Sequence, residues 1–314
     1  MKTGGYKLLA VSLMVALLIV GGTAALTYAE DYTLGLSIST LNNPFFVTLR
    51  DGAKSAANDL GVDLVVADGQ DSVSKQMSDI ENLVSRGVDA LLINATDGEA
   101  VVPAVEEANE AGIPVLAIDR GIAGGEVALY VASNNVTGGK MAAHYTAARL
   151  ALEGKVVMLE GIPGTSAARE RGRGFTEVMG NFPGIEIVSS EPAGFAQNKG
   201  YEVMQNILTA QPEIDAVFAQ NDLMALGALQ AIEGAGRSEE MFVVGFDAID
   251  PAIDAIEKGR LSATIMQQPG LMGEMGVRQA VKLLNGEVGV EEGKTKFIPV
   301  PLKLITKDNL SLAK

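Results

Sequence analysis

Short apolar runs alternate with amphipathic stretches along the chain from Thr33 onward. In the first half the apolar runs predict strands at 34–39, 64–67, 90–94, 115–119 and 129–133. Apolar residues at helical spacing between these runs predict helices at 44–60, 74–86 and 99–111. Pro44 at the start of the first helix is the residue type expected at that position.

The same alternation begins again in the second half of the chain. Strands are predicted at 156–160, 185–189, 216–219, 242–247 and 263–266, with helices at 166–180, 199–211 and 222–233. Strands that alternate with helices through glycine-rich connections are typical of a parallel, doubly wound sheet. We therefore expect an α/β protein with two Rossmann-like lobes, each a parallel sheet flanked by helices.

The end of the chain predicts how the two lobes are joined. A helix at 271–284 precedes a last strand at 297–305. If the late helix returns to the first lobe, residues 30–133 and 268–296 form the N-terminal lobe, and residues 134–267 and 297–314 form the C-terminal lobe. Several crossings restrict relative motion to a hinge bend. The expected hinge lies near Ser133 and Asn134, Gln267, and Lys296 and Phe297.

Residues 1–29 have the pattern of a secretory signal peptide. Lys2 and Lys7 precede an uncharged apolar run at 8–20, and small residues lead to Ala29. We expect cleavage after Ala29, so that the mature chain begins at Glu30. The alternative is an uncleaved anchor, because 8–29 is long enough to span a bilayer. The chain has no Cys, which excludes a lipid-modified cysteine and favours the periplasm of a double-membraned bacterium.

Composition narrows the function further. The content of 47% hydrophobic and 5% aromatic residues suits buried aliphatic strands. Without its leader the chain carries 22 basic and 39 acidic residues, a net charge of −17, so nucleic acid and anionic lipid are not expected as partners. The absence of Cys removes disulfides, thiol nucleophiles and thiolate metal sites. No metal and no cofactor are expected.

Polar residues fall at equivalent strand ends in the two halves. Asn94 and Asp119 end the third and fourth strands of the first half, 25 positions apart, and Asn221 and Asp247 do so in the second half, 26 positions apart. Ligands of open α/β sheets bind beyond the carboxyl ends of the strands. The repeated spacing predicts one site between two lobes. The alternative is that each Asn or Asp only caps the following helix.

A sugar has apolar C–H faces and hydroxyl groups that both donate and accept hydrogen bonds. Its site therefore needs flat aromatic rings and charged or amide groups around the ring edge. The segment 39–46, Ser-Thr-Leu-Asn-Asn-Pro-Phe-Phe, places both kinds of residue at one turn between a strand and a helix. Adjacent Phe45 and Phe46 cannot both face the same stripe of a helix.

Seven segments resemble, in order and spacing, motifs of periplasmic ribose-binding proteins, the pentose- and hexose-binding components of ABC importers with the type I periplasmic binding protein fold. They are 39–46; 90–97, with Ala95 where Pro is usual; 118–120; 161–172; 216–222; 243–247; and 263–267. The resemblance covers essentially the whole mature chain. It implies a monosaccharide ligand, with D-ribose favoured and allose or autoinducer-2 as alternatives.

The resemblance also implies which side chains bind the ligand. They are Ser39, Asn43, Phe45, Phe46, Asn94, Asp119, Arg120, Arg171, Phe195, Asn221, Asp247 and Gln267. Phe46 and Phe195 would sandwich the sugar ring, with Phe45 at one edge. The four charged side chains would bind hydroxyls, and Ser39 and Asn94 would support them. The implied partners are a membrane permease and a chemoreceptor, and the expected state is a monomer.

The chain lacks the sequence features of two other classes of protein, enzymes and transcriptional regulators. No nucleophile elbow, phosphate loop or metalloprotease motif is present, and His144, the only histidine, lies in a helical stretch, so no catalytic residue is assigned. A sugar-responsive repressor would carry a basic helix-turn-helix where this chain has its leader. A membrane-anchored sugar-sensing ectodomain stays open as the alternative.

Overall fold

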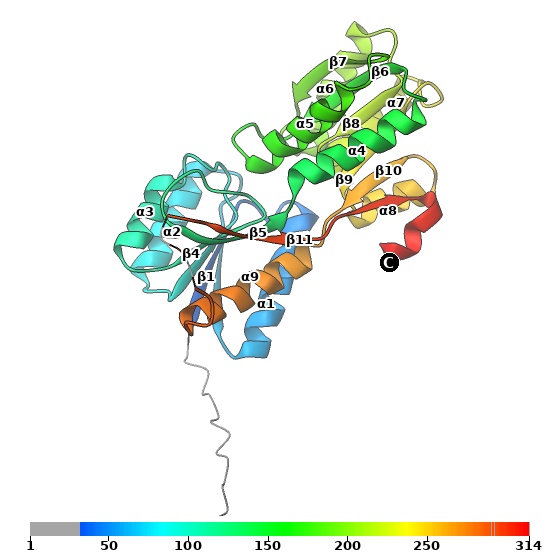
Figure 1. Cartoon of the computed structure of the whole chain (residues 1–314). Coiled ribbons are helices and arrows are strands. Elements are labelled where there is room, and N and C mark those ends of the chain that lie inside the picture. The colour runs from blue at the N-terminus through cyan, green and yellow to red at the C-terminus, as the bar shows by residue number, and fades with distance from the viewer. Residues whose placement is uncertain (1–31, 290, 292, 314) are drawn as a thin grey trace, which may run out of the picture.

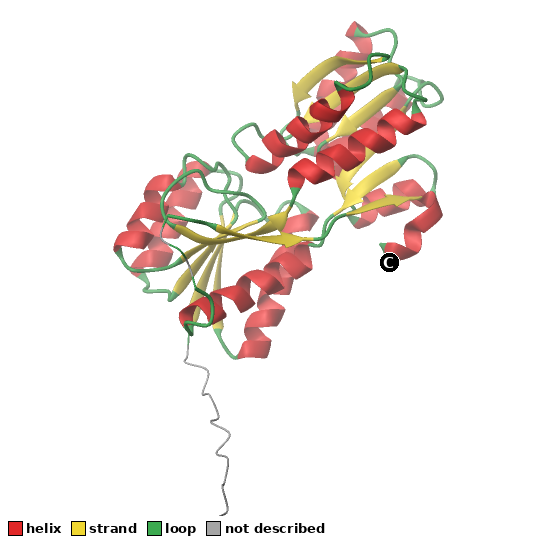
Figure 2. Cartoon of the chain, in the orientation of Figure 1, coloured by secondary structure: helices red, strands yellow, loops and turns green. Residues whose placement is uncertain are grey.

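The protein consists of two α/β lobes that lie side by side, joined by three chain segments (Figure 1). The structure is a computed structural model and describes residues 32–289, 291 and 293–313. The predicted signal peptide lies outside the described residues. No helix in the described ranges has the length and apolar character needed to cross a membrane. Helices flank the sheet in each lobe, as Figure 2 shows, and this arrangement is the α/β fold class predicted from the sequence.

The first lobe is built on a six-stranded sheet with the order β11-β5-β4-β3-β1-β2. Its strands are β1 (Thr33–Ile38), β2 (Asp63–Asp68), β3 (Ala90–Ile93), β4 (Val115–Ile118), β5 (Val127–Ser133) and β11 (Lys296–Val300). Its helices are α1 (Pro44–Leu60), α2 (Val73–Ser85), α3 (Val102–Glu110) and α9 (Pro269–Leu284). One face of the sheet packs against α1 and α9, and the other packs against α2 and α3.

The second lobe repeats this plan with the order β12-β10-β9-β8-β6-β7. Its strands are β6 (Gly154–Glu160), β7 (Ile185–Pro192), β8 (Ala216–Ala219), β9 (Phe242–Asp247), β10 (Ala263–Met266) and β12 (Lys303–Thr306). Its helices are α4 (Asn135–Arg149), α5 (Ser166–Met179), α6 (Gln197–Ala210), α7 (Asp222–Gly234) and α8 (Asp250–Glu257), followed by the 3₁₀ helix η1 (Lys307–Leu312). The sequence analysis did not predict α8.

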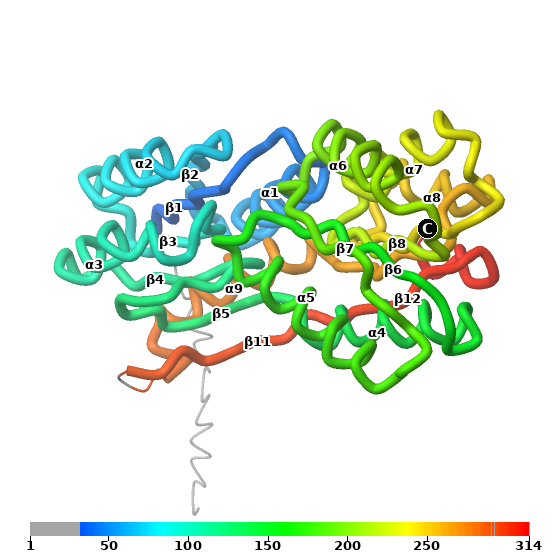
Figure 3. The backbone as a smooth tube through the Cα atoms, turned by 90° about the horizontal axis from the view of Figure 1, so that it is seen from above, coloured from blue at the N-terminus to red at the C-terminus, as the bar shows by residue number. Residues whose placement is uncertain are grey.

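Three crossings link the lobes. The chain passes from β5 to α4, from β10 back to α9, and from β11 to β12. Figure 3 shows β11 running along the first lobe toward β12 in the second. The first two crossings lie at the expected residues, next to Ser133 and Gln267.

The third crossing differs from the prediction. Residues 297–305 were expected to form one strand of the second lobe, but β11 pairs in parallel with β5 of the first sheet, and β12 pairs antiparallel with β10 of the second. Residues 297–300 therefore lie in the first lobe, and the crossing falls at Pro301 and Leu302. Pro301 and Leu302 separate the two strands and belong to neither. β11 and β12 are separated by only two residues, so in the sequence they look like one strand although they belong to different sheets.

Candidate functional site

A small cavity lies between the lobes, at the carboxyl ends of strands from both sheets. Its lining consists of Asn43, Phe45, Phe46, Asp119, Arg120, Ala167, Arg171, Phe195, Asn221, Asp247 and Gln267. Ten of the twelve residues predicted from the sequence are in this lining. Little free space remains between these side chains, so the cavity suits one small molecule and not an oligomer.

The turn between β1 and α1 brings an amide and two rings into the cavity. Asn43 precedes the helix, and its side-chain oxygen accepts the N–H of Phe45 at 3.0 Å, while Pro44 occupies the first helical turn. The rings of Phe45 and Phe46 meet edge to face, with centroids 5.2 Å apart. Both rings are buried and both line the cavity, so the capped helix start presents two neighbouring aromatic groups to it.

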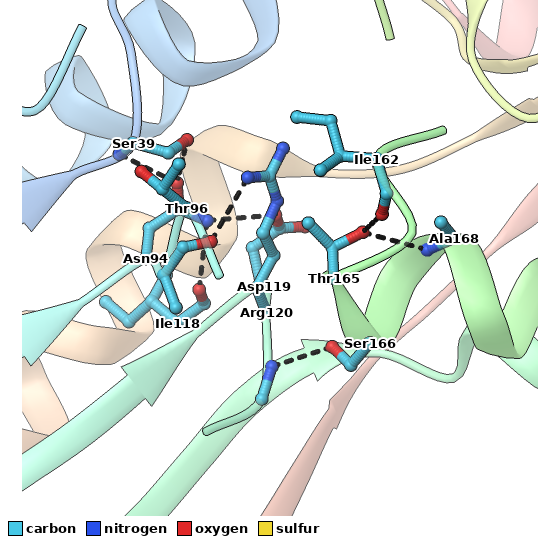
Figure 4. Close-up of polar contacts among 12 residues, drawn as sticks. Ser39, Asn94, Thr96, Ile118, Asp119, Arg120, Ile162, Thr165, Ser166 and Ala168 are labelled. Carbon is cyan, nitrogen blue, oxygen red and sulfur yellow. Dashed lines mark hydrogen bonds and ion pairs between the residues drawn. The ribbon is translucent and has the colours of Figure 1, made fainter. Parts of the chain in front are cut away.

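Asn94 and Ser39 lie behind the cavity wall and hold Asp119 in place (Figure 4). The Asn94 side-chain oxygen accepts the N–H and O–H of Ser39, at 3.2 and 2.7 Å. The Asn94 amide donates to a carboxylate oxygen of Asp119 at 3.1 Å and to the carbonyl of Ile118 at 3.2 Å. Asn94 therefore does not cap a helix. In the structure, Asn94 and Ser39 support Asp119.

Arg120 contacts both of the rings, Phe46 and Phe195, that were expected to sandwich the sugar. Its guanidinium carbon is 5.0 Å from the ring centroid of Phe46 and 5.5 Å from that of Phe195. Its Nη1 donates to the carbonyl of Ala95 at 3.1 Å, and its Nε is 3.9 Å from Asp119. Phe46 belongs to the first lobe and Phe195 to the second, so rings from both lobes contact one cation.

The second lobe contributes Arg171, a buried residue of α5. Its Nε donates to the side-chain oxygen of Asn135 at 2.9 Å, and its Nη1 donates to the carbonyl of Gln220 at 2.7 Å. The guanidinium carbon is 3.8 Å from the ring centroid of Phe246, and Nη1 lies 3.6 Å from Asp247. These contacts fix the plane of the guanidinium against the cavity, in place of the surface ion pair that an arginine on a helix often forms.

Asp247, Gln267 and Asn221 complete the second-lobe wall. The Gln267 amide donates to Asp247 at 2.8 Å, close to the crossing between β10 and α9. Asn221 caps α7 by accepting the N–H of Met224, and its amide donates to the carbonyl of Phe195 at 3.1 Å. Asn221 therefore both caps α7 and lines the cavity.

Three lining residues have backbone conformations that favour glycine. The φ angles are 62° at Asp119, 60° at Phe195 and 117° at Asp247. Such conformations persist only where the surroundings hold them, and they cluster at binding sites. The tip of the Phe195 ring lies against Gly161, where an added Cβ would come within 2.0 Å of the ring. The glycine and the strained turn together place the Phe195 ring in the cavity.

Burial dominates the electrostatics of the cavity. It raises the pKa of the Asp247 carboxyl to about 7, although Arg171 and the hydrogen bond from Gln267 act in the opposite direction. It also raises the pKa of Asp119 against the attraction of Arg120 and Arg171, and it lowers the pKa of Arg120. Charged groups out of water need close polar partners, which favours a ligand that supplies hydrogen bonds.

The hydrogen-bonding capacity of the wall shows what such a ligand must offer. Within the described residues, Asp119 Oδ1 and Gln267 Oε1 are buried acceptors without a hydrogen-bond partner in the chain. Buried acceptors of this kind are satisfied by donors. The arginines can donate to oxygen, and the Phe rings can cover an apolar face. The arrangement therefore suits a small polyhydroxylated ring. The described residues hold no group of three or more His, Asp or Glu side chains placed to bind a metal.

Sequence reasoning missed several residues of the site. Ala167 lines the cavity, and Asn135, Gln220 and Phe246 hold Arg171. Asn135 directly follows the first crossing and Gln220 directly precedes Asn221, so their positions beside predicted elements were the available signal. Phe246 resembled an ordinary strand residue, and only its contact with Arg171 distinguishes it.

Two similar lobes with a polar cavity between them, lined by side chains of both, define a two-lobed ligand-binding protein. Residues 34–288 match the family model of the periplasmic binding protein domain. The chain is 47% identical over 296 residues to the ribose import binding protein RbsB of Escherichia coli K12, covering 94% of this chain and 97% of that protein. The chain belongs to the periplasmic binding protein family.

Solved structures agree with this assignment. The Caulobacter myo-inositol binding protein bound to myo-inositol superposes with a TM-score of 0.85 at 32% identity, covering 91% of this chain and 96% of that one. A periplasmic solute binding protein of an ABC transporter from Actinobacillus succinogenes with bound D-allose gives a TM-score of 0.81 at 31% identity, covering 90% and 99%.

Proposed function

We propose that this protein is the substrate-binding component of an ABC sugar importer, that it binds D-ribose between its lobes, and that it presents the closed form to a membrane permease. The observation that carries the proposal is the pair of rings, Phe46 and Phe195, that come from different lobes and flank a cavity lined by two carboxylates and two guanidiniums. Rings cover the C–H faces of a sugar, and the charged groups bind its hydroxyls.

D-ribose is preferred among monosaccharides for two reasons. The cavity is small, and the relative that covers nearly the whole chain at 47% identity is named for ribose import. D-allose is the second candidate, because a structural neighbour at 31% identity carries it. Autoinducer-2 is a third, with a similar pattern of hydroxyls. We propose all twelve predicted side chains as the site, with Ser39 and Asn94 acting through Asp119.

The proposal also covers where the protein acts in the cell and what it binds besides sugar. We propose a periplasmic protein released by cleavage after Ala29, a monomer, with no catalytic residue and with a chemoreceptor as a further partner. The alternative is a sensory ectodomain that keeps its leader as an anchor. Family membership supports the periplasm, and cell fractionation separates the free form from the anchored one.

The experiment is calorimetry on protein stripped of bound sugar by unfolding and refolding. D-ribose, D-allose, other pentoses and hexoses, and autoinducer-2 are titrated in turn. We expect D-ribose to bind most tightly and with one site per chain. If D-allose or autoinducer-2 binds more tightly than D-ribose, that ligand takes the place of D-ribose in the proposal. If none of the tested ligands binds, the proposal is overturned.

A further inference from the structure

Asp222 is a fully buried carboxylate that lies beside the cavity without lining it. It follows Asn221 in the sequence and begins α7. Its Oδ1 accepts the O–H of Thr264 at 2.7 Å, and its Oδ2 accepts the backbone N–H of Ile249 at 3.0 Å. One bond therefore reaches the turn that follows β9 directly, and the other reaches Thr264 of β10, whose hydroxyl contacts the same turn. Asp247, the last residue of β9, leads into that turn.

The turn after β9 is strained. Asp247 and Ala248 have φ angles of 117° and 62°, and neither is glycine. Such conformations persist only where neighbouring groups hold them. The N–H of Ala248 donates to the Thr264 hydroxyl at 3.3 Å, and the next N–H, of Ile249, donates to Asp222. The Thr264 hydroxyl accepts the N–H of Ala248 and donates to Asp222. The turn, the Thr264 hydroxyl and the Asp222 carboxylate therefore form one chain of hydrogen bonds.

The sheet leaves space for this carboxylate. Gly245 faces Asp222, and an added Cβ there would come within 2.1 Å of Oδ1. Keeping an acid at this position is costly. Burial raises the pKa of Asp222 well above its usual range, and repulsion from Asp247 acts in the same direction. A hydrophobic residue of similar size would avoid that cost but would leave the N–H of Ile249 without an acceptor.

We propose that Asp222, acting with Thr264, is a positioning residue that sets sugar affinity by holding the turn from which the Asp247 carboxylate faces Arg171. Asp247 is 3.6 Å from Arg171 and lines the cavity, whereas Asp222 reaches the site only through the turn. The inference rests on the proposed function, in that Asp247 must bind the sugar. Asp222 would then influence sugar affinity without contacting the sugar.

The test is a double-mutant cycle with D-ribose as the probe. Asp222→Asn keeps the shape of the side chain and removes one acceptor, and we expect it to lower ribose affinity by about tenfold. In an Asp247→Ala background, titrated to high ribose concentration, the same change should have no further effect. A residue that acts through Asp247 has nothing left to position once that carboxylate is gone.

Two further variants separate positioning from general damage. Thr264→Val removes the relaying hydroxyl and should lose affinity, and Thr264→Ser retains the hydroxyl and should restore it. The control is Asp215→Asn, since Asp215 also accepts a backbone N–H, from Lys155, but precedes β8 at the opposite end of the sheet. It should lower the melting temperature without changing ribose affinity.

The outcomes distinguish this inference from the proposal on which it rests. Asp247→Ala with wild-type ribose affinity overturns the assignment of the site itself. Loss of binding in Asp247→Ala, combined with unchanged affinity in Asp222→Asn, overturns only the positioning role. An equal loss from Asp222→Asn in both backgrounds also overturns it, because the effect then bypasses Asp247.

Discussion

The backbone N–H of Gly121 donates a 2.8 Å hydrogen bond to the hydroxyl of Ser166, and this bond joins the two lobes. Gly121 follows β4 in the first lobe, and Ser166 begins α5 in the second; Figure 4 shows this bond close to Asp119 and Arg120. A second bond, from Gly98 to the carbonyl of Gly164, lies nearby at 3.2 Å. None of these four residues lines the cavity, so the chain itself contributes contacts that hold the lobes together.

Ser166→Ala should therefore weaken ribose binding although Ser166 does not line the cavity. Losing one hydrogen bond of about 1 kcal/mol from the closed state alone reduces affinity roughly fivefold. A ligand shifts the equilibrium between open and closed lobes by its differential affinity for the closed state. If a bond specific to the closed state is removed, more of the binding free energy of ribose is spent on closure, and the measured affinity falls. Calorimetry measures the affinity, and small-angle scattering measures the decrease in radius of gyration on adding ribose.

The control for this variant is Ser238→Ala, since Ser238 is exposed and lies far along the second lobe. It should bind ribose as the wild type does. A Ser166→Ala protein with wild-type affinity would show that the bond does not help to set the closed state. An unchanged scattering profile for wild-type protein at saturating ribose would exclude hinge closure altogether.

Asp119→Ala should reduce ribose affinity by at least about tenfold with little loss of fold. The change removes a buried carboxylate that would accept hydrogen bonds from hydroxyls, each worth ~1.5–3 kcal/mol. The control is Asp59→Ala, because Asp59 is a surface residue of the same lobe whose partner, Arg278, lies 3.1 Å away. Surface pairs contribute little. Equal affinities for the two variants would remove Asp119 from the site.

Gly161→Ala should weaken binding by displacing an aromatic ring. The new methyl group would overlap the ring of Phe195, which must then leave its position over the cavity. The matched change is Gly234→Ala, where an added Cβ meets nothing within 4 Å, and which should leave binding unchanged. Ribose titrations of both variants test this expectation. If Gly161→Ala binds normally, the ring is not a sugar-facing wall.

Closure without sugar should depend on pH. Asp247 has a pKa of about 7 when buried, above the ~3.9 of a solvated Asp. Between these values the closed form binds more protons than an open form with a solvated carboxylate, so ligand-free closure is favoured at low pH and weakens as pH rises toward 7. The radius of gyration of ligand-free protein should therefore be smaller at pH ~5 than at pH ~8.

Asp247→Asn provides the control for the pH experiment. The amide carries no charge at any pH, so this variant should be more closed than the wild type at high pH and should respond less to pH. The raised pKa of Asp119 supplies the response that remains. The same pH dependence in both proteins would assign the effect to other groups.

The mature protein should begin at Glu30. Intact mass spectrometry of the periplasmic fraction would then give the mass of residues 30–314. A full-length mass found only in membranes would contradict cleavage and support the anchored ectodomain.

Much of this architecture follows from local sequence. Apolar runs of strand length and amphipathic stretches depend on neighbouring residues alone, so the alternation of strands and helices in both lobes could be predicted. The start of α1 was visible for the same reason, since Pro44 stands at the beginning of that helix. The order of motifs along the chain indicated ten of the residues that line the cavity.

What the sequence by itself determined was therefore the identity of the elements and of most lining residues. Only the tertiary structure decided that Asn135 and Phe246 hold Arg171, that residues 297–300 join the first sheet, and that Asp222 supports the turn of Asp247. The physical reason is distance along the chain. Asn135 and Arg171 are 36 positions apart, and Thr264 and Asp222 are 42 apart, so their contacts exist only after the sheets have formed.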